Sequence, residues 1–232
     1  MTLAKKHSLF VIEDAAQATG TDYFFSDGTS KKAGTIGDIG TTSFFPSKNL
    51  ACYGDGGAMF TNDDLLAKKM KSIANHGQKV KYHHDYIGVN SRLDTIQAAI
   101  LKVKLKHLSQ FNSARRSVAD FYDKAFAGCS HFIIPERVRY SSHIFHQYTI
   151  RVKSRKRDEL KNYLLSKGIP TMIYYPGPLH MQPAYRYLGF DENDFPVTSD
   201  LCREVLSLPM HPDLEQEQID HIVLNIRKFF DN

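Results

Sequence analysis

The chain carries a lysine in a loop that follows a strand-like segment ending in two acidic residues. The apolar run at residues 9–12 leads directly into Glu13 and Asp14, which predicts a buried strand that delivers a carboxylate to the rim of a sheet. Lys48 follows among small hydroxyl residues and aromatic rings, where burial would remove part of its charge. The fold must therefore bring an amine and a distant strand-end carboxylate into one site.

An amine nucleophile and a distant carboxylate are the two groups that pyridoxal phosphate chemistry requires. The lysine would hold the aldehyde as a Schiff base, and the carboxylate would keep the pyridine nitrogen protonated so that the ring can accept electrons. Taken alone, an acidic pair after a strand is more often a strand end or a helix cap. The presence of Lys48 downstream makes the cofactor-binding interpretation of Asp14 the favoured one.

Composition and charge place few limits on function. The chain has 232 residues, 42% of them hydrophobic and 24% charged, which is typical of a globular protein. No apolar run approaches the roughly 20 residues that span a bilayer, and the first residues do not form a signal peptide, so we expect a cytoplasmic protein. The net charge is +5, but the densest basic run, 153–161, contains Asp158 and Glu159. This favours a solvated helix over a nucleic-acid-binding face.

The residue pattern also predicts the elements around these motifs. Residues 20–34 indicate a loop or a loose hairpin, and Asn62 or Asp63 should cap a helix that ends near Ala74. Further strands are expected at 39–45, 57–61, 144–152, 169–175 and 206–209, and helices at 93–127 (with an interruption near Asn112), 157–167, 198–206 and 215–230. Three widely spaced cysteines and the histidine pairs lack metal-ligand spacing, so no metal is expected.

Several short segments occur in an order that resembles a known family. They are EDAAQ at 13–17, GD at 37–38, SFFPSKNL at 43–50, GDGG at 54–57, NHG at 75–77 and GVNSRLD at 88–94. The set is similar to the DegT/DnrJ-type nucleotide-sugar aminotransferases, which are fold-type I enzymes that use pyridoxal phosphate. The resemblance implies an α/β chain: a partial cofactor-binding large domain at 1–110, then an interdomain helix and a small α+β C-terminal domain at 111–232.

The resemblance also assigns roles to residues near the lysine. Lys48 would bind the cofactor covalently and then shuttle protons. Asp14 would pair with the pyridine nitrogen, Gln17 would contact the ring hydroxyl or support Asp14, and Ser43 would donate to the cofactor phosphate. Asn90 would reach the phosphate from a neighbouring subunit, which implies a homodimer with shared active sites. From the residues alone, the segment around Asn90 is better explained as a turn with a helix cap at Ser91.

The remaining candidates would bind substrate. Arg92 could pair with a substrate carboxylate or phosphate, or else form a salt bridge with Asp94. His146, Tyr174 and His180 lie where the family lines its sugar pocket, although a strand histidine is more often structural. The resemblance implies transfer of an amino group from glutamate to a nucleotide-linked keto sugar, in the synthesis of surface polysaccharide such as O-antigen. The motifs are most similar to those of enzymes whose acceptor is a UDP-linked 3-oxo glucuronic acid derivative.

Two rivals follow from the same comparison. Sugar dehydratases of this fold carry histidine in place of the lysine, so Lys48 argues against them. Family chains are also longer at the N-terminus, and residues 3–7 read as the tail of a helix. We therefore expect the chain to begin within the large domain, so that a separate N-terminal half would complete it. The alternative is a truncated remnant or a subunit of a split enzyme that acts through protein–protein contact.

Overall fold

The computed structural model describes residues 1–231. The chain divides into two compact units, each made of two stretches of sequence. The first contains residues 1–113 and 138–146, and the second contains residues 114–137 and the chain from 147 onward. These units are defined by contacts within the chain and are not the same thing as domains. The domain boundary expected between residues 110 and 111 therefore stays a prediction.

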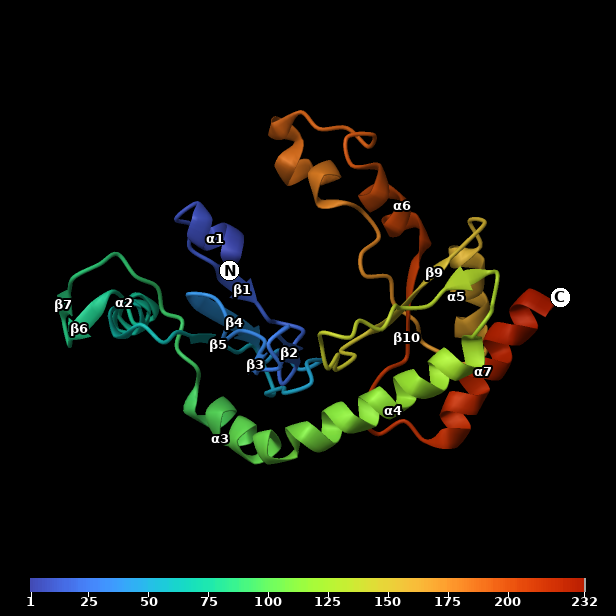
Figure 1. Ribbon diagram of the computed structural model, residues 1–232, viewed down its shortest axis with the longest axis horizontal. Helices are drawn as coiled ribbons and strands as arrows, with labels where there is room; N and C mark the ends of the chain where they lie inside the picture. Colours follow the sequence, from blue (N-terminus) through green and yellow to red (C-terminus); the bar gives the residue numbers. More distant parts are fainter. Residues whose placement is uncertain (232) are drawn as a thin grey trace. The chain divides into compact units, whose positions relative to one another are not determined.

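The first unit is built on a three-stranded sheet (Figure 1). Its strands β1 (Ile12–Asp14), β4 (Ile39–Ser43) and β5 (Gly57–Phe60) lie in the order β1-β4-β5. Strand β1 runs parallel to β4 with Asp14 opposite Thr41, whereas β5 runs antiparallel with Gly57 opposite Ser43. Parallel pairing brings the carboxyl ends of β1 and β4 to the same edge of the sheet.

Strand β1 lies where the sequence predicts it, but it is not buried. Leu9, Phe10 and Ile12 are 63%, 86% and 67% exposed. Among the described residues β1 pairs only with β4, so it is an edge strand and its apolar side chains have nothing to pack against. The expected burial is therefore wrong for this structure.

Shorter elements surround the sheet of the first unit. Asp63 caps the second helix, because its carboxylate accepts hydrogen bonds from the N–H groups of Leu65 and Leu66 at 2.7 and 2.9 Å. The expected hairpin at 20–34 is present as two short antiparallel strands. The elements are α1 (Thr2–Lys6), β2 (Asp22–Phe24), β3 (Ser30–Lys32), α2 (Asp64–Ala74), β6 (Gln78–Val80), β7 (His83–His84), α3 (Thr95–Lys104) and the 3-10 turn η1 (Leu105–His107).

The long helical pattern is interrupted earlier than the sequence suggests. Helix α3 passes through η1 into α4 (Leu108–Phe126), so the irregular turn lies at residues 105–107 and Asn112 is inside a regular helix. Asn112 is 3% exposed, and its amide is hydrogen-bonded to Asn49 and Thr19. In the sequence, a polar residue on the apolar face of a helix suggests that the helix is interrupted. Here Asn112 is instead a buried side chain whose amide is hydrogen-bonded.

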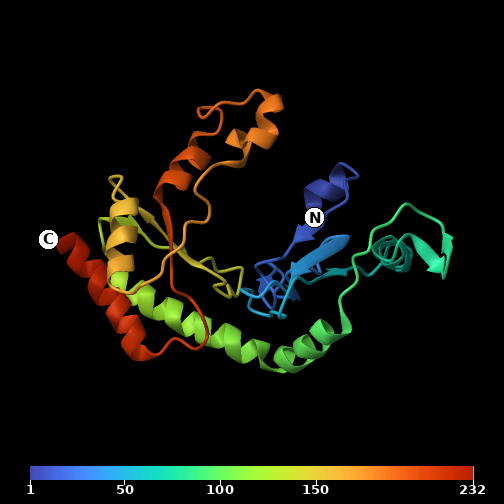
Figure 2. The same cartoon turned by 180° about the vertical axis from the view of Figure 1, so that it is seen from behind.

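The second unit has an antiparallel sheet in the order β10-β9-β8. Its strands are β8 (Phe132–Ile133), β9 (Tyr148–Val152) and β10 (Val205–Leu208), and its helices are α5 (Arg157–Ser166), η2 (Leu179–Met181), η3 (Pro183–Leu188), α6 (Pro196–Glu204) and α7 (Gln216–Asp231). Helices α5 and α7 lie side by side, as Figures 1 and 2 both show. Ile150, Leu206, Leu160 and Ile226 are fully buried and form part of the core.

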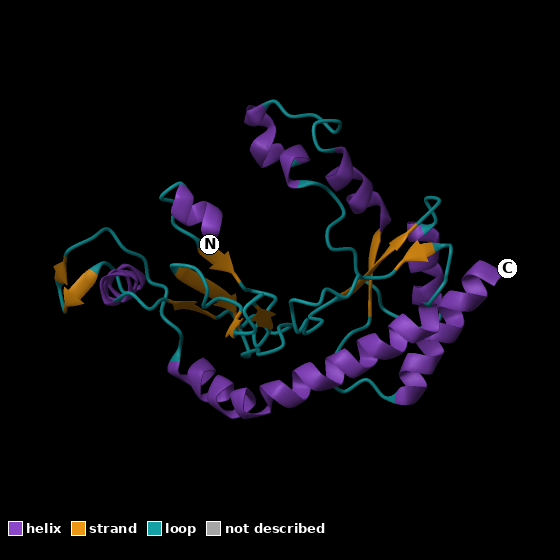
Figure 3. Ribbon diagram, viewed as in Figure 1, coloured by secondary structure: helices purple, strands orange, loops and turns teal. Residues whose placement is uncertain are grey.

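Two strand predictions in this region need correction. The strand expected from residue 144 begins at Tyr148, because Phe145 adopts φ = +46°, which is outside the range of a strand. The strand expected at 169–175 is absent from the described residues: Figure 3 draws the segment after α5 as loop, and only Met172 pairs with Ser207. Pro170 lies inside the segment and Pro176 follows it, and neither proline has a backbone N–H to donate to a neighbouring strand.

No helix within residues 1–231 is both long enough and apolar enough to cross a membrane.

Candidate active site

The two acidic residues at the end of β1, Glu13 and Asp14, have different surroundings: Glu13 is bound by backbone N–H groups and Asp14 is exposed. The Glu13 carboxylate accepts hydrogen bonds from the N–H groups of Gly34, Ile36 and Gly37 at 2.9, 2.5 and 2.6 Å. Asp14 is exposed, and within residues 1–231 its side chain accepts only a local hydrogen bond, from the N–H of Ala16 at 3.0 Å. Glu13 therefore holds the 34–37 segment, and Asp14 is the acid that can reach a ligand.

Sequence reasoning assigned no role to Glu13. The available signal was the glycine-containing stretch that ends at Gly40, since closely spaced backbone N–H groups need an acceptor when they are not in a regular strand. The same stretch approaches β4 closely: a Cβ added at Gly40 would collide with the backbone of Gly34. The hydrogen bonds from the 34–37 backbone to Glu13 explain the carboxylate, and the close approach of this segment to β4 explains the glycines.

Ser43 ends the neighbouring parallel strand β4 at the same sheet edge, and Lys48 follows in the loop after it. Ser43 is the last residue of β4, and its hydroxyl accepts a hydrogen bond from the N–H of Phe45 at 3.2 Å. The chain then turns, with the N–H of Lys48 donating to the carbonyl of Phe45 at 2.8 Å. Lys48 is half-buried. Asp14, Ser43 and the loop of Lys48 thus follow the carboxyl ends of the two parallel strands.

An apolar cluster holds the loop after Lys48. Leu50, Cys52 and Leu101 are 5%, 1% and 7% exposed, and Phe44 and Leu108 pack against them. The Cys52 N–H also donates to the carbonyl of Phe44 at 2.8 Å. The loop is therefore anchored on its C-terminal side by burial.

Gln17, Asn90 and Arg92 are exposed residues of the first unit. Asn90 forms an isolated backbone bridge with Asn75, and the Arg92 guanidinium donates to the Asn75 side-chain oxygen at 3.2 Å. No Arg92–Asp94 ion pair occurs within the described part of the chain. Arg92 instead lines a cavity of about 410 Å³ that also contains Thr41, Thr42 and Asp55.

The C-terminal candidates are divided between the two units. His146 belongs to the first unit and precedes β9, so it is not on the strand where the sequence analysis expected it. Tyr174 and His180 belong to the second unit, where both are half-buried and the His180 ring lies 4.7 Å from that of Phe195. Their role in one pocket with Lys48 stays a prediction.

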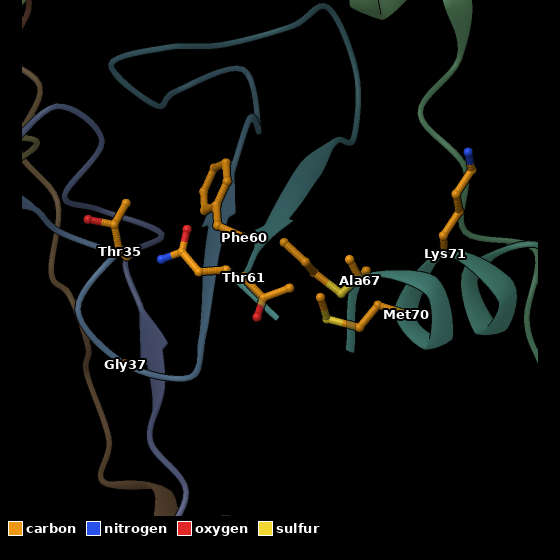
Figure 4. A pocket seen from close by; sticks show the side chains of 10 residues that line it. Thr35, Gly37, Phe60, Thr61, Ala67, Met70 and Lys71 are labelled. Carbon is orange, nitrogen blue, oxygen red and sulfur yellow. The ribbon is translucent and has the colours of Figure 1, made fainter. Parts of the chain in front are cut away.

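A hollow of the first unit contains none of the predicted residues. This pocket of about 560 Å³ lies between the end of β5 and helix α2 (Figure 4). Phe60 and Thr61 line one side, Ala67 and Met70 line the other, and Lys71 points away. Its lining has no paired acid and amine, so its size does not make it the candidate active site. The described residues also contain no group of three histidine, cysteine or acidic side chains that could hold a metal ion.

The residues at the edge of β1 and β4 suit pyridoxal phosphate in kind. They provide an exposed carboxylate for a ring nitrogen, a hydroxyl for a phosphate and a half-buried amine for an aldehyde. Glu13 is already engaged by three backbone donors, which leaves one carboxylate of the pair for the ring.

A family model covers almost the whole chain. The model of the DegT/DnrJ/EryC1/StrS aminotransferase family matches residues 1–227. The chain belongs to this family. Enzymes of the DegT/DnrJ/EryC1/StrS family depend on pyridoxal phosphate, act on nucleotide sugars and form dimers, which confirms the resemblance stated from the motifs.

Curated relatives carry aminotransferase and regulatory names. A pleiotropic regulatory protein of Geobacillus stearothermophilus is 47% identical, with 98% of this chain and 60% of the relative covered. A UDP-N-acetyl-3-dehydro-α-D-glucosamine 3-aminotransferase of Acidithiobacillus ferrooxidans is 43% identical (98% and 59% covered). A UDP-2-acetamido-2-deoxy-3-oxo-D-glucuronate aminotransferase of Pseudomonas aeruginosa is 42% identical (94% and 57% covered). The chain thus spans about 60% of the length of these relatives.

Solved structures of family members share the fold. DesV of Streptomyces venezuelae, in complex with a ketimine intermediate, matches with a TM-score of 0.93 at 37% identity, over 100% of this chain and 60% of that one. NtdA of Bacillus subtilis, with bound cofactor PMP, matches with a TM-score of 0.85 at 31% identity, over 100% and 52%. The prediction of a C-terminal portion of the fold-type I architecture is confirmed.

Proposed function

We propose that this chain is the part of a nucleotide-sugar aminotransferase that carries the cofactor lysine. The observation that supports this most directly is the shared sheet edge: Asp14 ends β1, Ser43 ends the parallel strand β4, and Lys48 follows one turn later. Pyridoxal phosphate, when bound, would supply an electron sink for the carbon that gains or loses the amino group.

The residues of the chain would each hold or move a specific group. Lys48 would attach to the aldehyde carbon and later carry a proton to and from the substrate carbon. Asp14 would accept a hydrogen bond from the protonated ring nitrogen, with Gln17 beside it. Ser43 would donate to the phosphate once its hydroxyl proton turns outward. Asn90 would reach the phosphate of a second copy in a homodimer.

The proposed substrates are glutamate as donor and a UDP-linked 3-oxo sugar as acceptor. Two relatives are named as enzymes that aminate UDP-linked 3-oxo or 3-dehydro sugars, one of them a glucuronate. Arg92 lines an open cavity and forms no ion pair there among the described residues, so its guanidinium is available for a carboxylate. His146, Tyr174 and His180 are the proposed sugar-binding residues.

A second candidate is a chain that works only when another polypeptide packs against it. The exposed apolar side chains of Ile12 on the edge strand and of Leu9 and Phe10 just before it favour this. In that case a separate N-terminal half would complete the cofactor site.

The first experiment is a visible absorption spectrum of the folded chain with added pyridoxal phosphate, before and after borohydride, followed by peptide mapping. The proposal predicts a band that borohydride removes, with the label on Lys48. Lys48→Arg should abolish the band, whereas Lys71→Arg, on the exposed face of α2, should keep it. Absence of the band from folded chain would reject autonomous cofactor binding and favour the second candidate. Glutamate and UDP-linked 3-oxo sugars are then tested as substrates.

A further inference from the structure

We propose that Asn49 and Asn112 form a buried amide pair that positions Lys48 relative to Asp14. The pair would fix the loop that carries Lys48, and through it the place of the lysine amine. The chemical consequence rests on the proposed function, but the ordering of the loop does not.

The lysine needs such a device because its loop has no ladder of its own. Residues 44–56 connect β4 to β5, and the lysine amine sits at the end of a flexible four-carbon stem. The apolar cluster anchors Leu50 and Cys52 after the lysine and Phe44 before it, but it contains no residue of 45–49. Displacement of a reacting group by about 1 Å can cost about a hundredfold in rate. The residue beside the lysine is therefore the place to look for a constraint.

Asn49 supplies that constraint. Its side chain is 7% exposed, and its Nδ2 atom donates to Asn112 Oδ1 at 2.7 Å and to the carbonyl of Ile144 at 3.3 Å. Both amide hydrogens are thus directed to acceptors in two other segments of the first unit. Its Oδ1 atom has no hydrogen-bond partner among residues 1–231, so the two donor bonds set the orientation of the amide. A buried amide held by two fixed acceptors allows one loop position.

Asn112 carries the constraint back to the strand ends. Its Nδ2 atom donates to the carbonyl of Thr19 at 3.1 Å, and the Thr19 hydroxyl shares a hydrogen bond of 2.7 Å with that of Thr42. The Thr42 hydroxyl donates to the carbonyl of Ala15 at 3.3 Å. Ala15 follows Asp14, Thr42 precedes Ser43, and Asn49 follows Lys48. One chain of hydrogen bonds therefore links the neighbours of Asp14, Ser43 and Lys48.

Gly20 shows how closely the backbone approaches this pair. Its φ is +93°, and a Cβ added there would lie 2.7 Å from Asn112 Nδ2. Gly20→Ala would therefore push the Asn112 amide without changing either amide group. The substitution also strains the backbone at this positive φ, so it disturbs the pair by a second route that leaves both amides in place.

The test compares Asn112→Leu, Gly20→Ala and the wild-type chain, with Asn225→Leu as a matched control. Asn225 is a buried amide of the second unit, 6% exposed, whose Nδ2 donates to the carbonyl of His221 within α7. Amide hydrogen exchange is measured first. Loss of about one hydrogen bond should speed exchange in residues 44–52 about tenfold in Asn112→Leu and in Gly20→Ala, and leave that loop unchanged in Asn225→Leu.

The second readout is the rate at which borohydride traps pyridoxal phosphate on Lys48. We expect this rate to fall about tenfold in Asn112→Leu, while the cofactor dissociation constant, measured in a Lys48→Ala background, changes less than about twofold. A general loss of structure would weaken both together. A slower trapping rate with an unchanged dissociation constant therefore identifies a role in positioning the lysine.

Each failure has its own pattern. Unchanged exchange at 44–52 in both variants overturns the amide pair. Faster exchange with an unchanged trapping rate also overturns it, because the loop would then be ordered without positioning the lysine. A folded wild-type chain that never traps the cofactor rejects autonomous cofactor binding, and with it the positioning of a reactive lysine in this chain alone, whereas the exchange measurement still decides whether the pair orders the loop. If Asn112→Leu does not fold, Gly20→Ala gives the same comparison.

Discussion

The two sheets of this protein are opposite in burial although both are rich in apolar residues. In the first unit Ile12 of β1 is 67% exposed, and Met59 and Phe60 of β5 are 49% and 41% exposed. In the second unit Ile150 of β9 and Leu206 of β10 are fully buried. Helix α5 and strand β10 are in contact there, whereas β1 and β5 are edge strands of a sheet that, among the described residues, has three strands.

The difference teaches that apolar sequence does not by itself create a core. In the second unit, helices of the same unit cover the sheet, so the apolar residues that stabilise this unit are buried within it. The first unit has exposed apolar side chains on an edge strand, which is where another polypeptide can pair. The candidate active site lies on the less covered of the two sheets.

The largest expected effect comes from one substitution made in both sheets. Ile150→Ala should lower the free energy of unfolding by about 2–5 kcal/mol, because it empties a buried site. Ile12→Ala should change it by less than about 0.5 kcal/mol, because the side chain is mostly in water. Urea unfolding followed by circular dichroism measures both. Equal losses would break the comparison and indicate that β1 is covered in solution, for example by a second copy.

Alkaline pH should destabilise the second unit selectively. Burial raises the pKa of Tyr122 and of Tyr148, and the hydrogen bond from Tyr148 to Asp123 at 2.6 Å raises that of Tyr148 further. The folded unit prefers the neutral phenols, so their contribution is complete below the ordinary pKa of 10.0. It is lost above that value, by about 1.4 kcal/mol per pH unit for each tyrosine.

Urea unfolding at pH 8, 10 and 11 checks this effect. The slope above pH 10 should become smaller in Tyr148→Phe, which has no proton to lose. Tyr23→Phe, at a partly exposed tyrosine of the first unit, is the control and should leave the slope unchanged. An equal slope in all three chains would contradict the assignment to the buried phenol.

A helix cap should matter in the first unit even though its sheet is open. Asp63→Ala removes the acceptor for two backbone N–H groups at the start of α2, and should cost about 1 kcal/mol. Asp64→Ala, in the first turn but making no recorded cap hydrogen bond, is the control. Hydrogen exchange of the α2 amides measures the loss. Equal effects of the two substitutions would mean that charge near the helix start, rather than the cap, stabilises α2.

The smallest effects are expected at surface ion pairs, where the two units should behave alike. Lys32–Asp22 in the first unit and Arg151–Glu204 in the second are separated by 2.7 and 2.8 Å and are partly exposed. Lys32→Gln and Glu204→Gln should each lower the free energy of unfolding by about 0.2–1 kcal/mol, and less at high salt. A loss above about 2 kcal/mol at either position would show that the pair is shielded from solvent.

Several elements were predictable because their causes are local. The cap at Asp63, helix α5 and the strand ends at Asp14 and Ser43 follow from spacing and from short-range hydrogen bonding. The segment at 169–175 was mispredicted because its strand-like residues lack a ladder partner apart from Met172. Burial of β1 was mispredicted for the same kind of reason, since burial depends on what packs against a strand.

The sequence by itself determined the order of the motifs, the family, and the position of Lys48 and Asp14 on neighbouring parts of one fold. Only the tertiary structure decided that Glu13 binds the 34–37 backbone, and that Asn112 is a buried partner of Asn49 rather than a helix break. The physical reason is separation along the chain. Periodicity reports which face of an element is apolar, but the donor and acceptor of a buried hydrogen bond are identified only when distant segments come together.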